Sequence, residues 1–156
     1  MVDWDEYFMS IAKVIAKKSK DPTTQVGCVI VDNNNRPVSF GYNGSVMGCD
    51  ESQIIFEKPY KDMLSIHAEM NALIFAKRDL TGCRIYVTNA PCDNCLKHLL
   101  QAGVREFIYD VFDTNGHFMT EERVKGIGIL LRSNTGVIYR NMNGETFFDE
   151  TKGLGL

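Results

Sequence analysis

One histidine, two cysteines and one glutamate have types and spacings suited to metal chemistry. His67, Cys92 and Cys95 offer one nitrogen and two sulfurs, which are ligand types that zinc favours. Three protein ligands leave the fourth tetrahedral position open, and this distinguishes a catalytic zinc site from a closed structural one. Glu69 lies two residues after His67, close enough to face the open position without being a ligand. The pattern predicts a catalytic zinc site with Glu69 as its acid and base.

Both halves of this motif stand where helices are expected to begin. Apolar periodicity predicts helices over 66–77 and 93–102, with Ile66, Met70, Leu73 and Ile74 as the packing residues of the first. A helix N-terminus offers free backbone N–H groups and partial positive charge to a bound ligand. Short apolar runs predict the neighbouring strands at 26–31, 38–42, 84–88 and 105–109.

The two ends of the chain complete the expected pattern. An apolar face at Trp4, Phe8, Ile11 and Ile15 predicts an N-terminal helix that ends by Asp21-Pro22. A helix over 120–132 and a strand over 137–141 are expected near the C-terminus, with a strand at 127–131 as the open alternative. A further short strand is expected at 146–149. Residues 1–150 are interpreted as a single domain, and 151–156 as a flexible tail.

Composition restricts the classes of function. The net charge of −3 argues against a long nucleic acid as the main partner. No apolar run approaches the roughly 20 residues of a membrane span, and the acidic N-terminus lacks a signal-peptide layout. A cytoplasmic location is therefore expected, in which the C-x-x-C pair is a metal or redox motif rather than part of a disulfide framework. Cys28 and Cys83, inside apolar runs, are expected to be buried thiols.

A closed structural zinc site is the alternative from a different class of protein. It needs a fourth ligand, and His98, three residues after Cys95, is the nearby candidate. Such a zinc-stabilised interaction module would have no turnover. It would also leave Glu69 without a role.

The chain resembles the cytidine-deaminase superfamily and, within it, the deoxycytidylate (dCMP) deaminases. The resemblance covers roughly residues 4–140 and rests on H-A-E at 67–69, P-C-x-x-C at 91–95, S-K-D-P-T-T-Q-V-G at 19–27, G-Y-N-G at 41–44 and Q-A-G at 101–103. It implies a three-layer α/β/α fold around a mixed five-stranded sheet. It also implies a hydrolase that converts dCMP to dUMP and ammonia and so supplies dUMP for thymidylate synthesis. Another small-molecule deaminase or a tRNA deaminase of the same fold is the alternative.

The resemblance also implies roles for individual residues. The backbone at Ala68 is expected to read the base and Asn43 to contact the sugar, while Lys20 and Thr24 are candidates for the phosphate. Family members often stack an aromatic ring on the cytosine, and Phe112 or Phe118 is the candidate here.

Regulation and assembly are implied in the same way. Relatives are commonly homohexamers that dCTP activates and dTTP inhibits, which points to Tyr42, Asn43 and Gly44 as effector-binding residues and to Mg²⁺ as a companion of the effector. Some relatives hold a second zinc through additional Cys and His residues. Cys49 is suggestive of such a site, but the needed companions are missing from 17–25 and 52–66, so one zinc per chain is expected.

Overall fold

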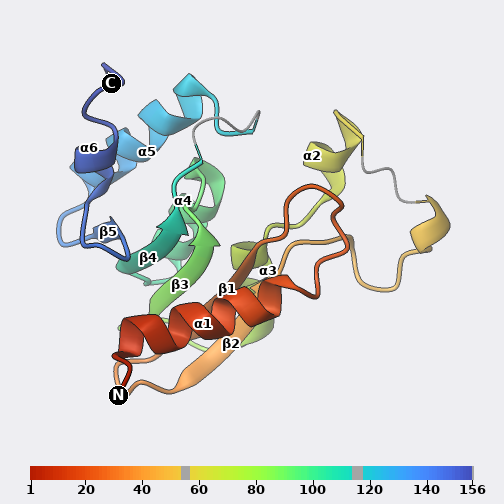
Figure 1. The fold of residues 1–156 in the computed structure, drawn as a ribbon, viewed down its shortest axis with the longest axis horizontal. Coiled ribbons are helices and arrows are strands. Elements are labelled where there is room, and N and C mark those ends of the chain that lie inside the picture. Colours follow the sequence, from red (N-terminus) through yellow and green to blue (C-terminus); the bar gives the residue numbers. More distant parts are fainter. Residues whose placement is uncertain (54–56, 114–117, 156) are drawn as a thin grey trace.

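A mixed five-stranded sheet forms the centre of this computed structural model, which describes residues 1–53, 57–113 and 118–155 (Figure 1). The strand order is β2-β1-β3-β4-β5. β1 runs antiparallel to both β2 and β3, whereas β3, β4 and β5 are parallel to one another. The strands are β1 (Gly27–Val31), β2 (Pro37–Tyr42), β3 (Arg84–Asn89), β4 (Glu106–Val111) and β5 (Ile138–Asn141). The five strands expected from the sequence are confirmed.

One face of the sheet is covered by α1 (Trp4–Ala16), which crosses it in Figure 1. The helix begins at an N-cap in which Asp3 Oδ1 accepts a hydrogen bond from the Glu6 backbone N–H at 2.8 Å. Trp4 is 53% exposed, so the expected apolar face is only partly buried. The buried contacts on this face come from Phe8, Met9, Ala12, Val29, Val31, Tyr86 and Ile108.

The opposite face is covered by α3 (Ala68–Ala76), α4 (Asp93–Gln101) and α5 (Glu121–Ser133). Alternate residues of β1 serve the two layers: Cys28 and Ile30 pack under these helices, and Val29 and Val31 pack under α1. A strand buried on both faces must be apolar throughout, which accounts for the unbroken run in the sequence. The three-layer α/β/α prediction is confirmed, and Cys28 and Cys83 are buried as expected.

α3 lies unusually close to the sheet. A Cβ atom on Gly41 of β2 would stand 2.2 Å from the Ala68 carbonyl oxygen and 2.7 Å from the Ala72 nitrogen. This approach selects small residues on the inner side of the helix, where Ala68 and Ala72 are fully buried. The prediction that Ile74 packs inward is therefore wrong, because its side chain is 52% exposed.

The C-terminal region corrects one predicted element. Residues 127–131 belong to α5, so the alternative strand there is excluded. The short strand expected at 146–149 is wrong, because α6 (Phe147–Glu150) occupies this stretch. Thr146 and Asp149 form a capping box, each side chain accepting a hydrogen bond from the other residue's backbone N–H. The reciprocal caps favour a helical turn. Beyond it, Thr151 is buried and its hydroxyl donates to the Phe147 carbonyl.

The long connection between β2 and α3 carries two short helical pieces, η1 (Glu51–Gln53) and α2 (Tyr60–Leu64). Figure 1 shows α2 standing apart from the sheet. Backbone hydrogen bonds between Gly44 and Ile66, at 2.8 and 3.1 Å, close the base of this connection. Within the described residues, no helix is both long and apolar enough to cross a membrane.

Gly41→Ala should destabilise the fold by about 1–3 kcal/mol, because the new methyl group must push α3 away from β2. The matched control is Gly44→Ala, whose Cβ would meet nothing within 4 Å. Urea unfolding followed by circular dichroism measures both variants. Equal stability of the two would show that the close approach of α3 does not constrain the sheet.

Candidate active site

Three ligand atoms converge where two helices begin. His67 is the N-cap residue of α3, Cys92 is the N-cap residue of α4, and Cys95 lies in the first turn of α4. The His67 Nδ1 atom is 3.6 Å from Cys92 Sγ and 3.4 Å from Cys95 Sγ. A tetrahedral zinc ion with ordinary bond lengths requires N···S separations of about 3.6 Å. The donor set and its spacing therefore fit zinc.

The loop before α4 is fixed from several sides. The Ala90 N–H donates to the Val111 carbonyl at 2.8 Å, and the Tyr139 hydroxyl donates to the Pro91 carbonyl at 2.7 Å. The Cys95 N–H donates to Cys92 Sγ at 3.5 Å, so the sulfur caps the helix. β4 and β5 thus fix the backbone just before Cys92, and α4 supplies the hydrogen bond to the Cys92 sulfur.

The local charges favour metal binding. A hydrogen bond from Cys95 and the nearby His67 imidazole lower the pKa of Cys92 well below its usual range. The hydrogen bond with Cys92, together with burial, raises the pKa of Cys95. The interaction with Cys92 raises the pKa of His67, although burial opposes this effect. The low pKa of Cys92 favours the thiolate form, which is the form that binds a metal ion.

Glu69 is buried beside this cluster, with a relative exposure of 4%. Burial raises its pKa to about 7, and the charge of Cys92 adds to the rise while His67 opposes it. A carboxyl group with such a pKa both accepts and releases a proton near neutral pH. This is the property that a shuttle of protons between a water molecule and a substrate requires.

A cavity of about 510 Å³ opens onto the cluster and is large enough for a small organic ligand. Its lining combines two of the metal ligands, His67 and Cys92, with the loop that follows α1, the G-Y-N-G loop and α2. The lining includes Asp21, Thr23, Thr24, Asn43, Lys61, His67, Ala68, Glu69, Cys92, Asp113 and Phe118.

The two aromatic candidates for stacking on the base differ in their position relative to the cavity. Phe118 lines the cavity, with its ring 5.0 Å from the His67 ring in an edge-to-face arrangement. The Arg123 guanidinium lies 4.3 Å from the centre of the Phe118 ring and also pairs with Asp93 at 2.8 Å. Phe112 instead packs against Tyr109 and Phe147 in the core and is absent from the cavity lining.

Not all of the other candidates for substrate contact line the cavity. Thr24, Asn43 and Ala68 line the cavity, whereas Lys20 is exposed and does not. The Asn43 side chain also supports the wall: its Oδ1 accepts from the Val26 N–H and its Nδ2 donates to the Thr24 carbonyl, both at 2.8 Å.

Two of the candidates for effector binding, Tyr42 and Gly44, are absent from the cavity lining. Tyr42 is 38% exposed, and its carbonyl accepts a hydrogen bond from Asn71 at 2.9 Å. Gly44 is paired with Ile66 through its backbone. Asn43 belongs to both candidate groups, so an effector site here would adjoin the cavity.

His98 does not join the ligand cluster. Its Nδ1 atom lies 2.7 Å from the Asn94 carbonyl oxygen, on the exposed side of α4. Among the described residues, the group of potential metal ligands that comes together is His67, Cys92 and Cys95. The geometry favours an open three-ligand site over the closed structural alternative.

Two residues near the cavity escaped sequence reasoning. Lys61 comes from the irregular stretch after β2, and Arg123 from a helix placed far along the chain. The i, i+3 or i, i+4 spacings that reveal helical neighbours do not apply to contacts made across the fold. No sequence signal marked either one.

Comparison with known protein families agrees with the metal-binding geometry of the site. Residues 2–111 match the family model described as cytidine and deoxycytidylate deaminase zinc-binding region. The chain is 40% identical over 115 residues to a deoxycytidylate deaminase of Pongo abelii, a match spanning 69% of this chain and 65% of the relative. It is 46% identical over 101 residues to an uncharacterized deaminase of Aliivibrio fischeri, with 65% and 68% covered.

A solved structure shares the architecture. The crystal structure of apo dCMP deaminase from the cyanophage S-TIM5 aligns with a TM-score of 0.67 and 25% identity, covering 88% of this chain and 96% of that one. The same deaminase is also known in complex with dCMP and dUMP. The chain belongs to the cytidine and deoxycytidylate deaminase zinc-binding family.

Proposed function

We propose that this protein hydrolyses dCMP to dUMP and ammonia with the help of one zinc ion, and so supplies dUMP for thymidylate synthesis. The observation that carries the proposal is the three-ligand cluster, with buried Glu69 beside it, at the wall of a cavity. The curated relatives named deoxycytidylate deaminase support the choice of substrate, although the chain spans 65% of the length of the mammalian ones. The S-TIM5 complex with dCMP and dUMP adds further support.

In the proposed reaction, each residue of the cluster, together with Glu69, has its own role. His67, Cys92 and Cys95 would hold zinc, which lowers the pKa of a water molecule at the open position toward neutrality. Glu69 accepts a proton from that water and passes it to N3 of the cytosine ring. The hydroxide left from that water would form a bond to C4. Glu69 would then take the proton of the new C4 hydroxyl group and give it to the amino nitrogen, so that the bond between C4 and that nitrogen breaks, the C4 carbonyl forms and ammonia leaves. Burial, which raises the pKa of this carboxyl, favours its role as the proton carrier.

The base is oriented by the walls of the cavity. We assign Phe118 rather than Phe112 as the ring that stacks on the cytosine, because Phe118 lines the cavity next to His67. The backbone at Ala68, at the N-terminus of α3, remains our candidate for a hydrogen bond to the base. Asn43 and Thr24 remain our candidates for the sugar and phosphate side.

The primary test is ammonia release from zinc-loaded protein that is offered dCMP, deoxycytidine and adenosine in a tRNA anticodon stem. We expect turnover of dCMP well above that of the other two. Turnover of the tRNA substrate alone would replace the proposal with RNA deamination. Absence of turnover with zinc bound would favour an interaction module.

Glu69→Gln should lower kcat for dCMP by about 10²- to 10⁴-fold, because the amide cannot carry the proton. Zinc content should stay near that of the unmodified protein, since Glu69 is not a ligand. Steady-state kinetics and metal analysis measure the two quantities. Retained activity in a zinc-loaded variant would remove Glu69 from the mechanism.

Cys95→Ser should lose zinc, whereas His98→Ala and Cys49→Ser should keep it, because only Cys95 of the three belongs to the cluster. Zinc content should also fall as pH drops below about 6, since protons compete for His67 and the thiolates. The raised pKa of His67 favours this competition as the medium becomes acidic. Zinc retained by Cys95→Ser would contradict the assignment.

Regulation and assembly follow as further proposals. We expect dCTP with Mg²⁺ to raise turnover and dTTP to lower it through the Tyr42–Gly44 loop, and we expect a homohexamer in light scattering. Unchanged kinetics with both nucleotides, at saturating and subsaturating dCMP, would exclude this regulation.

A cytoplasmic location agrees with Cys28, Cys49, Cys83, Cys92 and Cys95 being free thiols in the structure.

A further inference from the structure

Phe118, the ring assigned to the base, depends on side-chain contacts for its orientation. It lies outside any helix or strand, two residues before the N-cap of α5, so no regular backbone structure orients it. The His67 ring meets it edge to face at 5.0 Å, and the Arg123 guanidinium lies 4.3 Å from its centre. A cation within about 6 Å of a ring centre is attracted to the ring. Arg123 therefore stabilises one orientation of Phe118.

The Phe118 ring stands between two hollows. One is the cavity of about 510 Å³ that Glu69 lines, and the other is a second hollow of about 550 Å³. Phe118 and His67 line both, whereas Arg123 lines the second and is absent from the first. The guanidinium therefore approaches the ring from the side away from the cavity. This arrangement leaves the cavity side of the ring for a planar base.

Arg123 is itself fixed to the start of α4. Its Nη1 atom lies 2.8 Å from Asp93 Oδ1, and this charge-assisted hydrogen bond has a well-defined direction. Asp93 is the first residue of α4 and directly follows Cys92. One guanidinium thus joins the Phe118 ring to the helix that carries two of the metal ligands.

The place of Arg123 in its own helix does not account for it. Arg123 is the third residue of α5, where the helix dipole disfavours a positive side chain and favours acidic ones such as Glu121 and Glu122. The contacts that offset this disadvantage, with Phe118 and Asp93, lie outside α5. They indicate a role for Arg123 at the cavity.

We propose that Arg123 is a positioning residue, which holds the Phe118 ring at a fixed place relative to the metal ligands so that the ring can stack on the base. The inference deepens the proposed function and rests on it. Stacking of a base on an aromatic side chain stabilises binding, and a ring that is already ordered loses less conformational freedom when the base arrives. Arg123 acts through the ring and needs no contact with the nucleotide.

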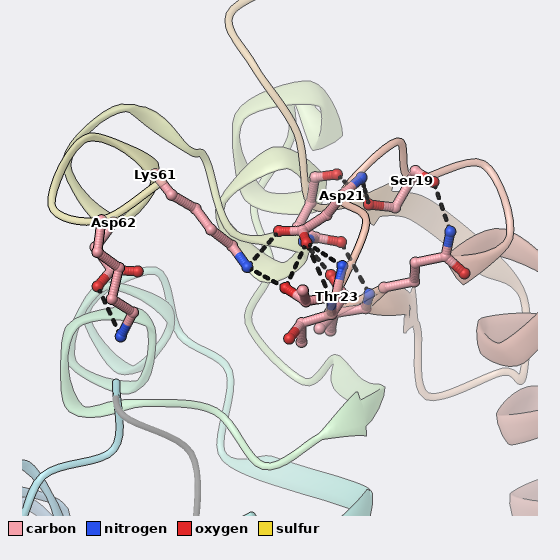
Figure 2. Close-up of polar contacts among 10 residues, drawn as sticks. Ser19, Asp21, Thr23, Lys61 and Asp62 are labelled. Carbon is pink, nitrogen blue, oxygen red and sulfur yellow. Dashed lines mark hydrogen bonds and ion pairs between the residues drawn. The ribbon is translucent and has the colours of Figure 1, made fainter. Parts of the chain in front are cut away.

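Another part of the cavity wall is fixed by separate contacts. Lys61 Nζ lies 3.0 Å from Asp21 Oδ2 and 2.6 Å from Thr23 Oγ1, as Figure 2 shows. These contacts join α2 to the loop that follows α1 and involve neither Phe118 nor Arg123. The ring is therefore held from the side of α4 and α5.

The first experiment needs no nucleotide. A 4-fluorophenylalanine in place of Phe118 reports the order of the ring by ¹⁹F NMR of the zinc-loaded protein. We expect a resonance displaced from that of the free amino acid, and Arg123→Met should move it toward the free value. Arg123→Lys, which keeps a cation, should retain part of the displacement. The matched control is Arg132→Met in the same helix, because Arg132 lies over Phe148, outside the cavity lining.

The second experiment is a double-mutant cycle on binding of dUMP and deoxyuridine, measured by calorimetry. Arg123→Met should weaken binding of both ligands by the same factor, about 3- to 10-fold, and Phe118→Leu should weaken it at least as much. In the Phe118→Leu protein, Arg123→Met should have no further effect, because the residue acts through the ring. Zinc content should stay near that of the unmodified protein in every variant.

The outcomes separate this inference from the reaction itself. An unchanged ¹⁹F spectrum in Arg123→Met would overturn the inference, whether or not dCMP is deaminated. Additive losses in the cycle would mean that Arg123 acts independently of the ring, and a loss confined to dUMP would mean that it acts on the phosphate; either result contradicts the proposal. If dCMP is not deaminated but the ¹⁹F displacement still depends on Arg123, the reaction assignment fails and the positioning of the ring stands.

Discussion

The site depends on the meeting of two helix N-termini. α3 and α4 begin next to each other on one face of the sheet, so that His67 and Cys92, their N-cap residues, approach within 3.6 Å. Free backbone N–H groups at these positions stabilise negative sulfur and would stabilise an electron-rich substrate as well. Cys92 already accepts one of them, from Cys95. A small rotation of either helix would separate the ligands.

The sheet fixes where the helices begin. β1 and β2 hold α3 through the absence of a side chain at Gly41, and β4 and β5 hold the start of α4 through the contacts at Ala90 and Pro91. Glu69 is then buried at the wall of the cavity, and burial raises the pKa of its carboxyl to about 7. The same arrangement that stabilises the layers therefore tunes the acid and base.

Local sequence patterns predicted much of the fold and of the site. The rest depends on contacts between residues that are far apart in the sequence. The ligands and Glu69 were predictable because spacing along a helix start determines which side chains share one place. The β1 strand was predictable from its apolar run. Ile74 was misplaced because the side of α3 that faces Gly41, far away in sequence, carries Ala68 and Ala72. Residues 146–149 were misread because a capping box competes with strand pairing. Phe118 could not be distinguished from Phe112, nor could Lys61 be found, since both depend on tertiary contacts.

The central claim is that the chain offers zinc three ligands and leaves one position open. X-ray absorption spectroscopy of the zinc-loaded protein tests it directly, with and without dUMP. We predict two sulfur neighbours at about 2.3 Å and one histidine nitrogen at about 2.0 Å. The fourth neighbour should be a light atom whose signal changes when dUMP binds. Two sulfurs and two histidine nitrogens, unchanged by dUMP, would mean that His98 closes the site, and would contradict the account.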